Sequence, residues 1–311
     1  MSAPTFSLGR QAGADGRFHR PESTFREQVE PGGRFPPEAG RYHLYVSHAC
    51  PWAHRTVIAR RLKGLEHAIS LSLVDPIRDL RGWAFSGGPY TDPVNGFAFL
   101  SEAYEATDPA FRGRISVPVL WDRTTGCIVN NESSEILRML DGAFGDLADD
   151  RVSLYPESLR DEIDALNAHI YATVNNGVYA AGFASTQPAY EDAYAALFTT
   201  LDELEERLST RRYLVGDAPT EADWRLFTTL VRFDTVYHGH FKCNRQRLVE
   251  FPALWGYTRD LFAQPGVADT VDLDQIKSHY YGTHPMVNPS GIVPVGPRID
   301  FTAPHDRASL G

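Results

Sequence analysis

The first half of the chain alternates short apolar runs with one helix-like segment. The run YHLYVS from Tyr42 is rich in aromatic and branched residues, which predicts a strand. HACPWAHRTVIARRLKGL follows directly and predicts a loop that enters a helix. A second strand, AISLSLV, is predicted over 68–74. Strand, helix and strand in this order indicate an α/β unit.

A polar turn separates two further apolar runs, over 117–122 and 127–130. They predict an antiparallel hairpin, and a helix is expected to follow from Ser133 or Ser134. We assign these elements to an α/β domain at 41–145.

From about residue 151 the apolar spacing becomes helical. Steps of three and four join Leu159, Ile163, Leu166 and Ile170, and then Tyr190, Tyr194, Leu197, Leu201, Leu204 and Leu208. Another helix is expected where Thr220 precedes Asp223 by three residues, because this spacing is typical of a capping box. These patterns predict an all-α domain at 151–270.

Three stretches show no such period. Residues 1–40 indicate an extended arm, with Phe6, Phe18, Phe25 and Phe35 available to anchor it. Residues 75–113 form a long inserted loop within the α/β domain, and 271–311 form a tail with too many prolines and glycines for regular structure.

Composition excludes several classes of protein. The 311 residues carry a formal charge of -10, which argues against nucleic acid as a partner, since phosphate contacts need a basic surface. Long apolar runs and a secretory leader pattern are lacking, so we expect no membrane association and a cytoplasmic protein. Three cysteines favour free thiols over a disulfide framework.

The reactive candidate among these thiols is Cys50. It lies between a strand and the first turn of a helix, where free backbone N–H groups and the helix dipole favour a thiolate. The residue three positions on is Ala53, so this CxxA site cannot close a local disulfide and would instead form a mixed disulfide with an external thiol. The alternative is an inert buried cysteine, which is the interpretation we prefer for Cys127 and Cys243.

Two neighbouring features fit a thiol-binding site. Val117 precedes Pro118 at the start of a strand, and a cis bond there would expose the Val117 backbone to an extended peptide. Glu132 and Ser133 stand at a predicted helix start, where N–H groups and hydroxyls bind a carboxylate; Ser133 as an ordinary N-cap is the alternative.

Together these motifs resemble the glutathione transferase superfamily. CPWA, VPVLWD, NES and GDAPTEAD carry that resemblance. The longer segments YVSHACPWAHRTVIARRLKGL, GWAF, NNGVYAAGF, TEADWRLFTTLVRFDTVYHGHFKCN, IKSHYY and NPSGIVPVGP resemble its xi class, the glutathionyl-hydroquinone reductases, from about Tyr42 to Pro297. The resemblance implies a thioredoxin-like N-terminal domain, an all-helical C-terminal domain, glutathione as co-substrate and a homodimer.

The same resemblance implies a role for individual residues. Cys50 matches the catalytic cysteine and Trp83 the aromatic residue that packs against glutathione. Val117 would pair with the cysteinyl backbone of the tripeptide, while Glu132 and Ser133 would hold its γ-glutamyl group.

Tyrosines and one arginine complete the implied set. Tyr179 and Tyr280 match catalytic tyrosines that line the aromatic pocket, and Tyr281 is a less certain match. Arg114 is our candidate for a basic contact to glutathione. Core packing is the alternative for Trp83 and the tyrosines, and simple exposure is the alternative for Arg114.

The implied activity is removal of glutathione from a glutathionyl-hydroquinone through a Cys50 mixed disulfide. One alternative is a broader thiol transferase of the omega or glutaredoxin type, acting on dehydroascorbate or mixed disulfides. The chain has 27 arginines and only three lysines, which suggests a high-GC genome. Mycothiol or another small thiol therefore stays open in place of glutathione.

Two further alternatives are weaker. A non-enzymatic binding module would be expected to lose the reactive thiol, and CPWA is intact. His238, His240 and Cys243 include metal-ligand residue types, but HxHxxC is not a structural-zinc spacing and supplies three ligands, so we expect no metal.

Overall fold

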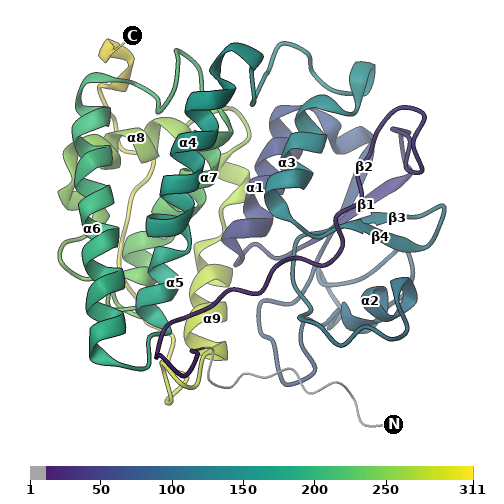
Figure 1. The fold of residues 1–311 in the computed structure, drawn as a ribbon, viewed down its shortest axis with the longest axis horizontal. Coiled ribbons are helices and arrows are strands. Elements are labelled where there is room, and N and C mark those ends of the chain that lie inside the picture. The colour runs from purple at the N-terminus through teal and green to yellow at the C-terminus, as the bar shows by residue number, and fades with distance from the viewer. Residues whose placement is uncertain (1–11, 311) are drawn as a thin grey trace. The chain divides into compact units, whose positions relative to one another are not determined.

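The computed structural model describes residues 12–310, which divide into two compact units (Figure 1). The first unit contains Pro21–Ser153 and Thr270–His279. The second contains the described residues up to Arg20, then Leu154–Asp269, and the chain from Tyr280 on. Phe6 lies outside the described residues.

A four-stranded sheet organises the first unit. Its strands are β1 (Tyr42–Val46), β2 (Ile69–Leu73), β3 (Val119–Asp122) and β4 (Cys127–Asn130), in the spatial order β2-β1-β3-β4. β1 pairs with β2 in parallel, whereas β1 with β3 and β3 with β4 are antiparallel. Every residue of β1 is buried, as expected of a central strand. The predicted strands and hairpin are therefore present.

Helices α1 (Pro51–Leu62) and α3 (Ser133–Gly142) pack against each other in this unit (Figure 1). Proline is suited to the first position of α1 because that residue needs no backbone donor there. α3 buries Ile136, Leu137 and Leu140, which share one helical face. Sheet and helices together form the α/β domain that the sequence pattern predicts.

The inserted segment is more regular than its composition suggests. Within 75–113 the structure contains helix α2 (Ser101–Thr107), which packs against β4. Our prediction of a loop throughout was wrong here, because Ala103 and Tyr104 bury one side of a helix too short to show a period. Before α2, the Asp92 carboxylate accepts hydrogen bonds from the Tyr45 hydroxyl, at 3.0 Å, and from three backbone N–H groups of its own loop.

The second unit is helical. Its helices are α4 (Arg160–Ile170), α5 (Gly177–Gly182), α6 (Gln187–Thr210), α7 (Glu221–Arg232) and α8 (Pro252–Phe262), and α9 (Leu273–Thr283) is divided between the units after His279. Single π-helical turns, Tyr171–Asn175 and Phe233–Tyr237, precede α5 and follow α7. These helices confirm the predicted helical character of this region.

Helix α7 forms the centre of the helical unit, since all of its residues are buried. Its predicted capping box is present: the Asp223 carboxylate accepts the Thr220 backbone N–H at 2.7 Å. Asp223 also accepts hydrogen bonds from the Leu214 N–H and the Tyr257 hydroxyl. Burial raises the pKa of this carboxyl, and these donors oppose the effect.

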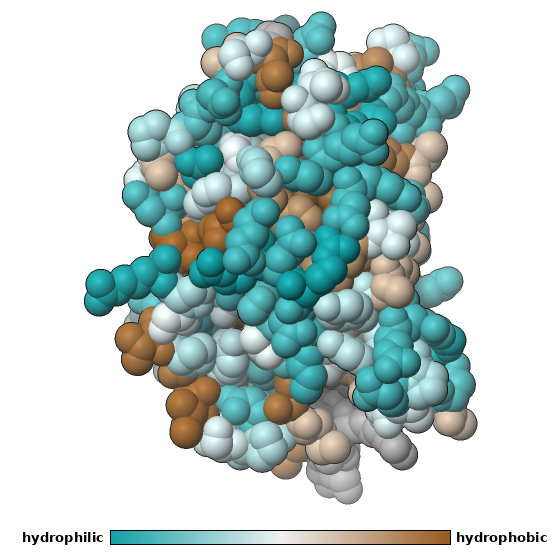
Figure 2. Space-filling model, turned by 90° about the vertical axis from the view of Figure 1, so that its left-hand side faces the viewer, coloured by the Kyte–Doolittle hydropathy of each residue, from teal (hydrophilic) through white to brown (hydrophobic). Residues whose placement is uncertain are grey.

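Helix α6 shows the expected division into two faces. Leu197, Leu201, Leu204 and Leu208 are buried, while charged side chains occupy the opposite face. The side of the helical unit that carries α6 is largely hydrophilic, with scattered hydrophobic side chains (Figure 2). Among the described residues, no helix is both long and apolar enough to cross a membrane.

The predictions for the tail and for the arm agree with the structure to different degrees. Our prediction that 271–311 lacks regular structure was wrong for α9, because the prolines and glycines gather after Thr283. The described part of the arm contains isolated β-bridges. Phe18 and Phe35 are buried and Phe25 packs edge-on to Tyr104, as expected of anchors.

A buried histidine in β1 generates a prediction about stability. Burial lowers the pKa of His43 from 6.5 to about 4, and Ser70 hydrogen-bonds its ring nitrogen Nδ1 at 2.7 Å. Between these two pH values the unfolded chain binds a proton that the folded chain does not. The free energy of unfolding should therefore fall as the pH decreases from about 6.5 to about 4, by up to a few kcal/mol.

The His43→Gln variant should lose part of this pH dependence in urea unfolding measured between pH 7 and pH 4.5. His67→Gln is the matched control, because His67 is an exposed histidine of the same unit. A His43→Gln slope equal to that of the wild type would contradict the assignment.

Candidate active site

Cys50 is the N-cap residue of α1, four positions beyond the end of β1. Its backbone is extended, with φ -81° and ψ 119°, and its carbonyl accepts the first helical hydrogen bond, from His54 N, at 3.0 Å. The first helical turn, whose N–H groups have no partner within the helix itself, thus begins directly after Cys50, and this residue is half-buried. All three cysteines are free, and Ala53 fills the position where a resolving thiol would stand.

The backbone of Val117 faces this thiol. The Cys50 sulfur lies 3.6 Å from the Val117 carbonyl oxygen, and the Val117-Pro118 bond is cis. The Tyr104 hydroxyl supports this turn from α2, donating to the Ser116 carbonyl at 2.8 Å and accepting from the Ser116 N–H at 3.1 Å. The inserted segment therefore fixes the backbone opposite the nucleophile.

Glu132 and Ser133 stand at the start of α3, as predicted. Glu132 is the N-cap, and its Oε1 accepts from the Ser134 N–H at 3.1 Å and the Ser134 hydroxyl at 3.0 Å. Ser133 is the first helical residue, so its alternative role as an ordinary N-cap is wrong. Burial raises the pKa of Glu132, but hydrogen bonds from Ser134 and Ser23 outweigh it, and the net pKa lies below its ordinary value.

A buried arginine that the sequence analysis missed lies beside these two residues. Arg55 of α1 is 1% exposed, and its Nη1 lies 3.5 Å from the Ser133 hydroxyl oxygen. The guanidinium carbon is 4.5 Å from the centre of the Trp52 ring. Arg114, our candidate for a basic contact, is exposed. The structure therefore places a cation, Arg55, within the cluster at the start of α3.

Trp83 lies in a separate aromatic stack of the first unit. Its ring is 4% exposed and stacks on the His279 imidazole at 5.0 Å and 15°. The Arg78 guanidinium lies 5.2 Å from the tryptophan ring, and Pro76 accepts a hydrogen bond from His279 Nδ1 at 2.6 Å. Arg78 lies in none of the motifs named above, and His279 lies within IKSHYY, but the motif does not indicate that its imidazole meets Trp83.

The second unit brings three tyrosine hydroxyls together. Tyr179 of α5 and Tyr280 of α9 lie 2.5 Å apart, oxygen to oxygen, and the Tyr237 hydroxyl lies 3.1 Å from that of Tyr280. Burial raises the pKa of Tyr237 and of Tyr280, so both phenols are neutral at pH 7. We call these three residues the tyrosine cluster.

Tyr237 was not among the site residues predicted from the sequence. It lies inside the segment that carried the family resemblance, but only folding reveals that it meets Tyr280. The Tyr281 ring packs on the His240 imidazole instead, with 4.7 Å between the ring centres. Arg20 from the arm approaches the cluster, its guanidinium 4.7 Å from the centre of the Tyr179 ring.

The HxHxxC segment is arranged differently from a metal site. Nε2 of His240 lies 3.1 Å from Nδ1 of His284, and Cys243 is fully buried, which raises the pKa of its thiol. Within residues 12–310, no group of three or more His, Cys, Asp or Glu side chains could hold a metal ion.

Two family models match the chain. Residues 49–143 match the N-terminal domain of glutathione S-transferase, and residues 187–260 match its C-terminal domain. These matches agree with the α/β and helical parts of the structure and confirm the predicted fold class: a thioredoxin-like domain followed by an all-helical glutathione transferase domain.

Individual relatives are similar over most of their length. The chain is 52% identical over 284 residues to glutathionyl-hydroquinone reductase PcpF of Sphingobium chlorophenolicum. The aligned region covers 91% of this chain and 90% of PcpF. The chain is 48% identical over 303 residues to glutathionyl-hydroquinone reductase YqjG of Escherichia coli, covering 94% and 92%.

Solved structures agree. The xi glutathione S-transferase of Phanerochaete chrysosporium superposes with a TM-score of 0.91 at 48% identity, covering 95% of this chain and 97% of that one. Glutathione-bound YqjG gives a TM-score of 0.89 at 47% identity, with 94% and 98% covered. The chain therefore belongs to the glutathione transferase family and, within it, to the xi class of glutathionyl-hydroquinone reductases.

Proposed function

We propose that this protein is a glutathione-dependent reductase that converts glutathionyl-hydroquinones to hydroquinones. The observation that carries the proposal is the position of Cys50. Its thiol lies at the start of α1, 3.6 Å from the carbonyl oxygen of Val117, just before β3. The names of PcpF and YqjG, both close relatives, point to the same substrate class.

The first step breaks a carbon–sulfur bond. The Cys50 thiolate attacks the sulfur of the glutathionyl group, and a Cys50–glutathione disulfide forms. The bonding electron pair passes to the ring carbon, which takes up a proton and gives the hydroquinone. Carbon is a poor leaving group, so a proton donor and hydrogen bonds to the ring oxygens would lower this barrier.

We assign that proton transfer to Tyr179 and Tyr280. Support comes from the tyrosine cluster itself: the Tyr179 and Tyr280 hydroxyls are hydrogen-bonded to each other, and burial raises the pKa of Tyr280, so this phenol keeps its proton at neutral pH. Tyr237, which contacts Tyr280, would hold the Tyr280 hydroxyl in place. Tyr281 has no part in this proposal because its ring packs on His240.

The second step restores the enzyme. A glutathione thiolate attacks the glutathione sulfur of the mixed disulfide, releasing oxidised glutathione and the Cys50 thiolate. The hydroquinone product thus leaves before the second substrate, glutathione, reacts, so the kinetics should be ping-pong.

Glutathione is the thiol that we propose, rather than mycothiol. The anionic Glu132 and the Ser133 hydroxyl at the α3 N-terminus suit the ammonium and carboxylate of a γ-glutamyl group. Val117 would pair with the cysteinyl backbone, Trp83 would pack on the tripeptide, and Arg114 would contact its far carboxylate. YqjG has been solved with glutathione bound.

A broader thiol transferase is the second candidate function. Relatives in two yeasts, 46% and 37% identical to this chain, are named omega-like glutathione S-transferases. Such an enzyme would need Cys50 but would not need the tyrosine cluster, since a sulfur leaving group requires no protonation at carbon.

We also propose a homodimer that acts in the cytoplasm. The dimer rests on the resemblance to the class. The location is supported by three cysteines that are all free, which fits a reducing compartment.

Replacement of the nucleophile tests the activity directly. Cys50→Ser should reduce glutathionyl-hydroquinone turnover to the background rate, because an alkoxide does not form at neutral pH and an alcohol does not attack sulfur. Cys127→Ser is the matched control and should retain the wild-type rate, measured as hydroquinone release. A Cys50→Ser enzyme with most of its activity would disprove the mechanism.

The covalent intermediate tests the thiol. Incubation with a glutathionyl-hydroquinone in the absence of free glutathione should add the mass of one glutathionyl group to Cys50, as read by mass spectrometry of the intact protein and its peptides. Added glutathione should remove the adduct. Parallel incubation with mycothiol disulfide should give little adduct, and a preference for mycothiol would reassign the co-substrate.

The tyrosines distinguish the two candidate functions. Tyr179→Phe and Tyr280→Phe should each lower the rate on glutathionyl-hydroquinone by at least about tenfold. The rate on a mixed disulfide of glutathione and a small thiol should change little. Tyr281→Phe is the control and should resemble the wild type. Wild-type rates of Tyr179→Phe and Tyr280→Phe on both substrates would favour the broader transferase.

A further inference from the structure

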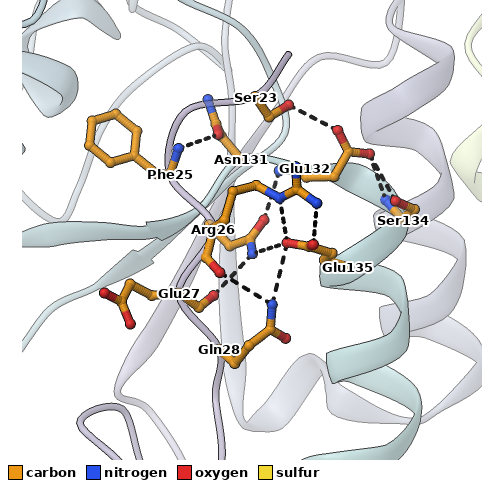
Figure 3. Close-up of polar contacts among 10 residues, drawn as sticks. Ser23, Phe25, Arg26, Glu27, Gln28, Asn131, Glu132, Ser134 and Glu135 are labelled. Atoms are coloured by element: carbon orange, nitrogen blue, oxygen red, sulfur yellow. Dashed lines mark hydrogen bonds and ion pairs between the residues drawn. The ribbon is translucent and has the colours of Figure 1, made fainter.

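One segment of the N-terminal arm lies against the start of α3, and we call residues 23–29 the strap (Figure 3). Its backbone pairs with the end of β4: Glu27 N–H donates to the Val129 carbonyl at 3.1 Å, and Asn131 N–H donates to the Phe25 carbonyl at 3.0 Å. The pairing is antiparallel, with Arg26 opposite Asn130. The strap thus adds a short stretch of antiparallel pairing to the edge strand β4, directly before α3, whose N-cap is Glu132.

Side chains fix the strap in register. Arg26 Nε donates to Glu135 Oε2 at 2.8 Å, and the second guanidinium nitrogen contacts the other carboxylate oxygen. Asn130 Nδ2 donates to the same Glu135 oxygen at 2.8 Å and to the Glu27 carbonyl at 3.0 Å. Bidentate arginine–carboxylate pairs constrain both orientation and distance, so the strap has little freedom to slide.

Ser23 at the beginning of the strap reaches Glu132 instead. Its hydroxyl donates to Glu132 Oε2 at 2.9 Å, while Oε1 accepts from Ser134 (Figure 3). Each oxygen of the carboxylate is therefore held by a separate donor, one from α3 and one from the arm. Hydrogen bonds at both oxygens restrict rotation of the carboxylate about its terminal bond. Oε1 already accepts two hydrogen bonds from Ser134, whereas Oε2 accepts one from Ser23 and retains a lone pair for a ligand.

Stability alone does not account for this contact. Arg26, Gln28 and Asn130 all converge on Glu135, which lies one helical turn beyond Glu132, and they already attach the strap. The Ser23 hydroxyl adds a bond to a carboxylate whose other oxygen is already used for capping. Its effect is to fix the direction of Oε2.

We propose that Ser23 is a positioning residue of the thiol site: its hydroxyl holds the Glu132 carboxylate in the orientation that receives the ammonium of the γ-glutamyl group. The inference rests on the proposed function, in which Glu132 binds that group. It assigns the arm a role in glutathione affinity, in addition to any role in folding.

Ser23→Ala tests the inference. The Michaelis constant for glutathione, and the dissociation constant for glutathione measured by calorimetry in the inactive Cys50→Ser background, should each rise about three- to tenfold. The turnover number at saturating glutathione should stay within about twofold, because Ser23 does not touch the reacting atoms. Ser23→Thr keeps the hydroxyl and should restore most of the affinity.

Two further variants separate positioning from structure. Gln28→Ala removes a strap side chain that contacts Glu135 and should bind glutathione like the wild type. In a Glu132→Ala background, Ser23→Ala should weaken binding no further, because its effect passes through Glu132.

The outcomes are distinct. Wild-type affinity in Ser23→Ala, a Ser23→Thr variant as weak as Ser23→Ala, or an additive loss with Glu132→Ala each overturns the positioning role while leaving the reductase intact. A wild-type chain that binds no glutathione overturns both the proposed function and the inference.

Discussion

The antiparallel pairing of β1 with β3 is the constraint on which the thiol site depends. Tyr45 lies opposite Val119, so the end of one strand and the beginning of the other meet at the same edge of the sheet. Four residues beyond β1 the chain reaches Cys50, and two residues before β3 it contains Val117. The backbone ladder therefore brings together a thiol and a carbonyl from positions 67 residues apart, and the two atoms lie 3.6 Å from each other.

Around this fixed pair, buried polar groups set the orientation of the chain. The Asp92 carboxylate accepts hydrogen bonds from its own loop and from Tyr45. The Tyr104 hydroxyl supports the turn before Pro118, and Glu132 caps α3. Each of these groups gives up water and recovers hydrogen bonds from backbone or hydroxyl donors. Such contacts contribute modestly to stability but restrict geometry strongly, because a buried acceptor that loses its donor costs more than the bond itself provides.

Local patterns in the sequence were sufficient to predict much of the fold. Strand patterns, the helix beginning at Pro51 and the capping box at Thr220 are local signals, and the structure contains all of them. Helices α2 and α9 were missed because one is only seven residues long and the other stands beside a proline-rich stretch. Arg55 and Tyr237 were missed for a different reason: Ser133 and Tyr280, which they contact, lie 78 and 43 residues away, and no spacing rule reports a contact that only folding creates. Tyr104 was missed together with the short helix α2 that carries it.

The strap also has a consequence for the order in which the chain is made. Ser23 is separated by 109 residues from Glu132, the residue it contacts. At ordinary rates of protein synthesis, on the order of 5 to 20 residues per second, the strap leaves the ribosome roughly 5 to 20 s before its partner exists. During that interval the Ser23 hydroxyl has no Glu132 carboxylate to bind. The strap can therefore close only once α3 has been made, and a chain interrupted before α3 would lack both the helix and the surface on which the strap lies.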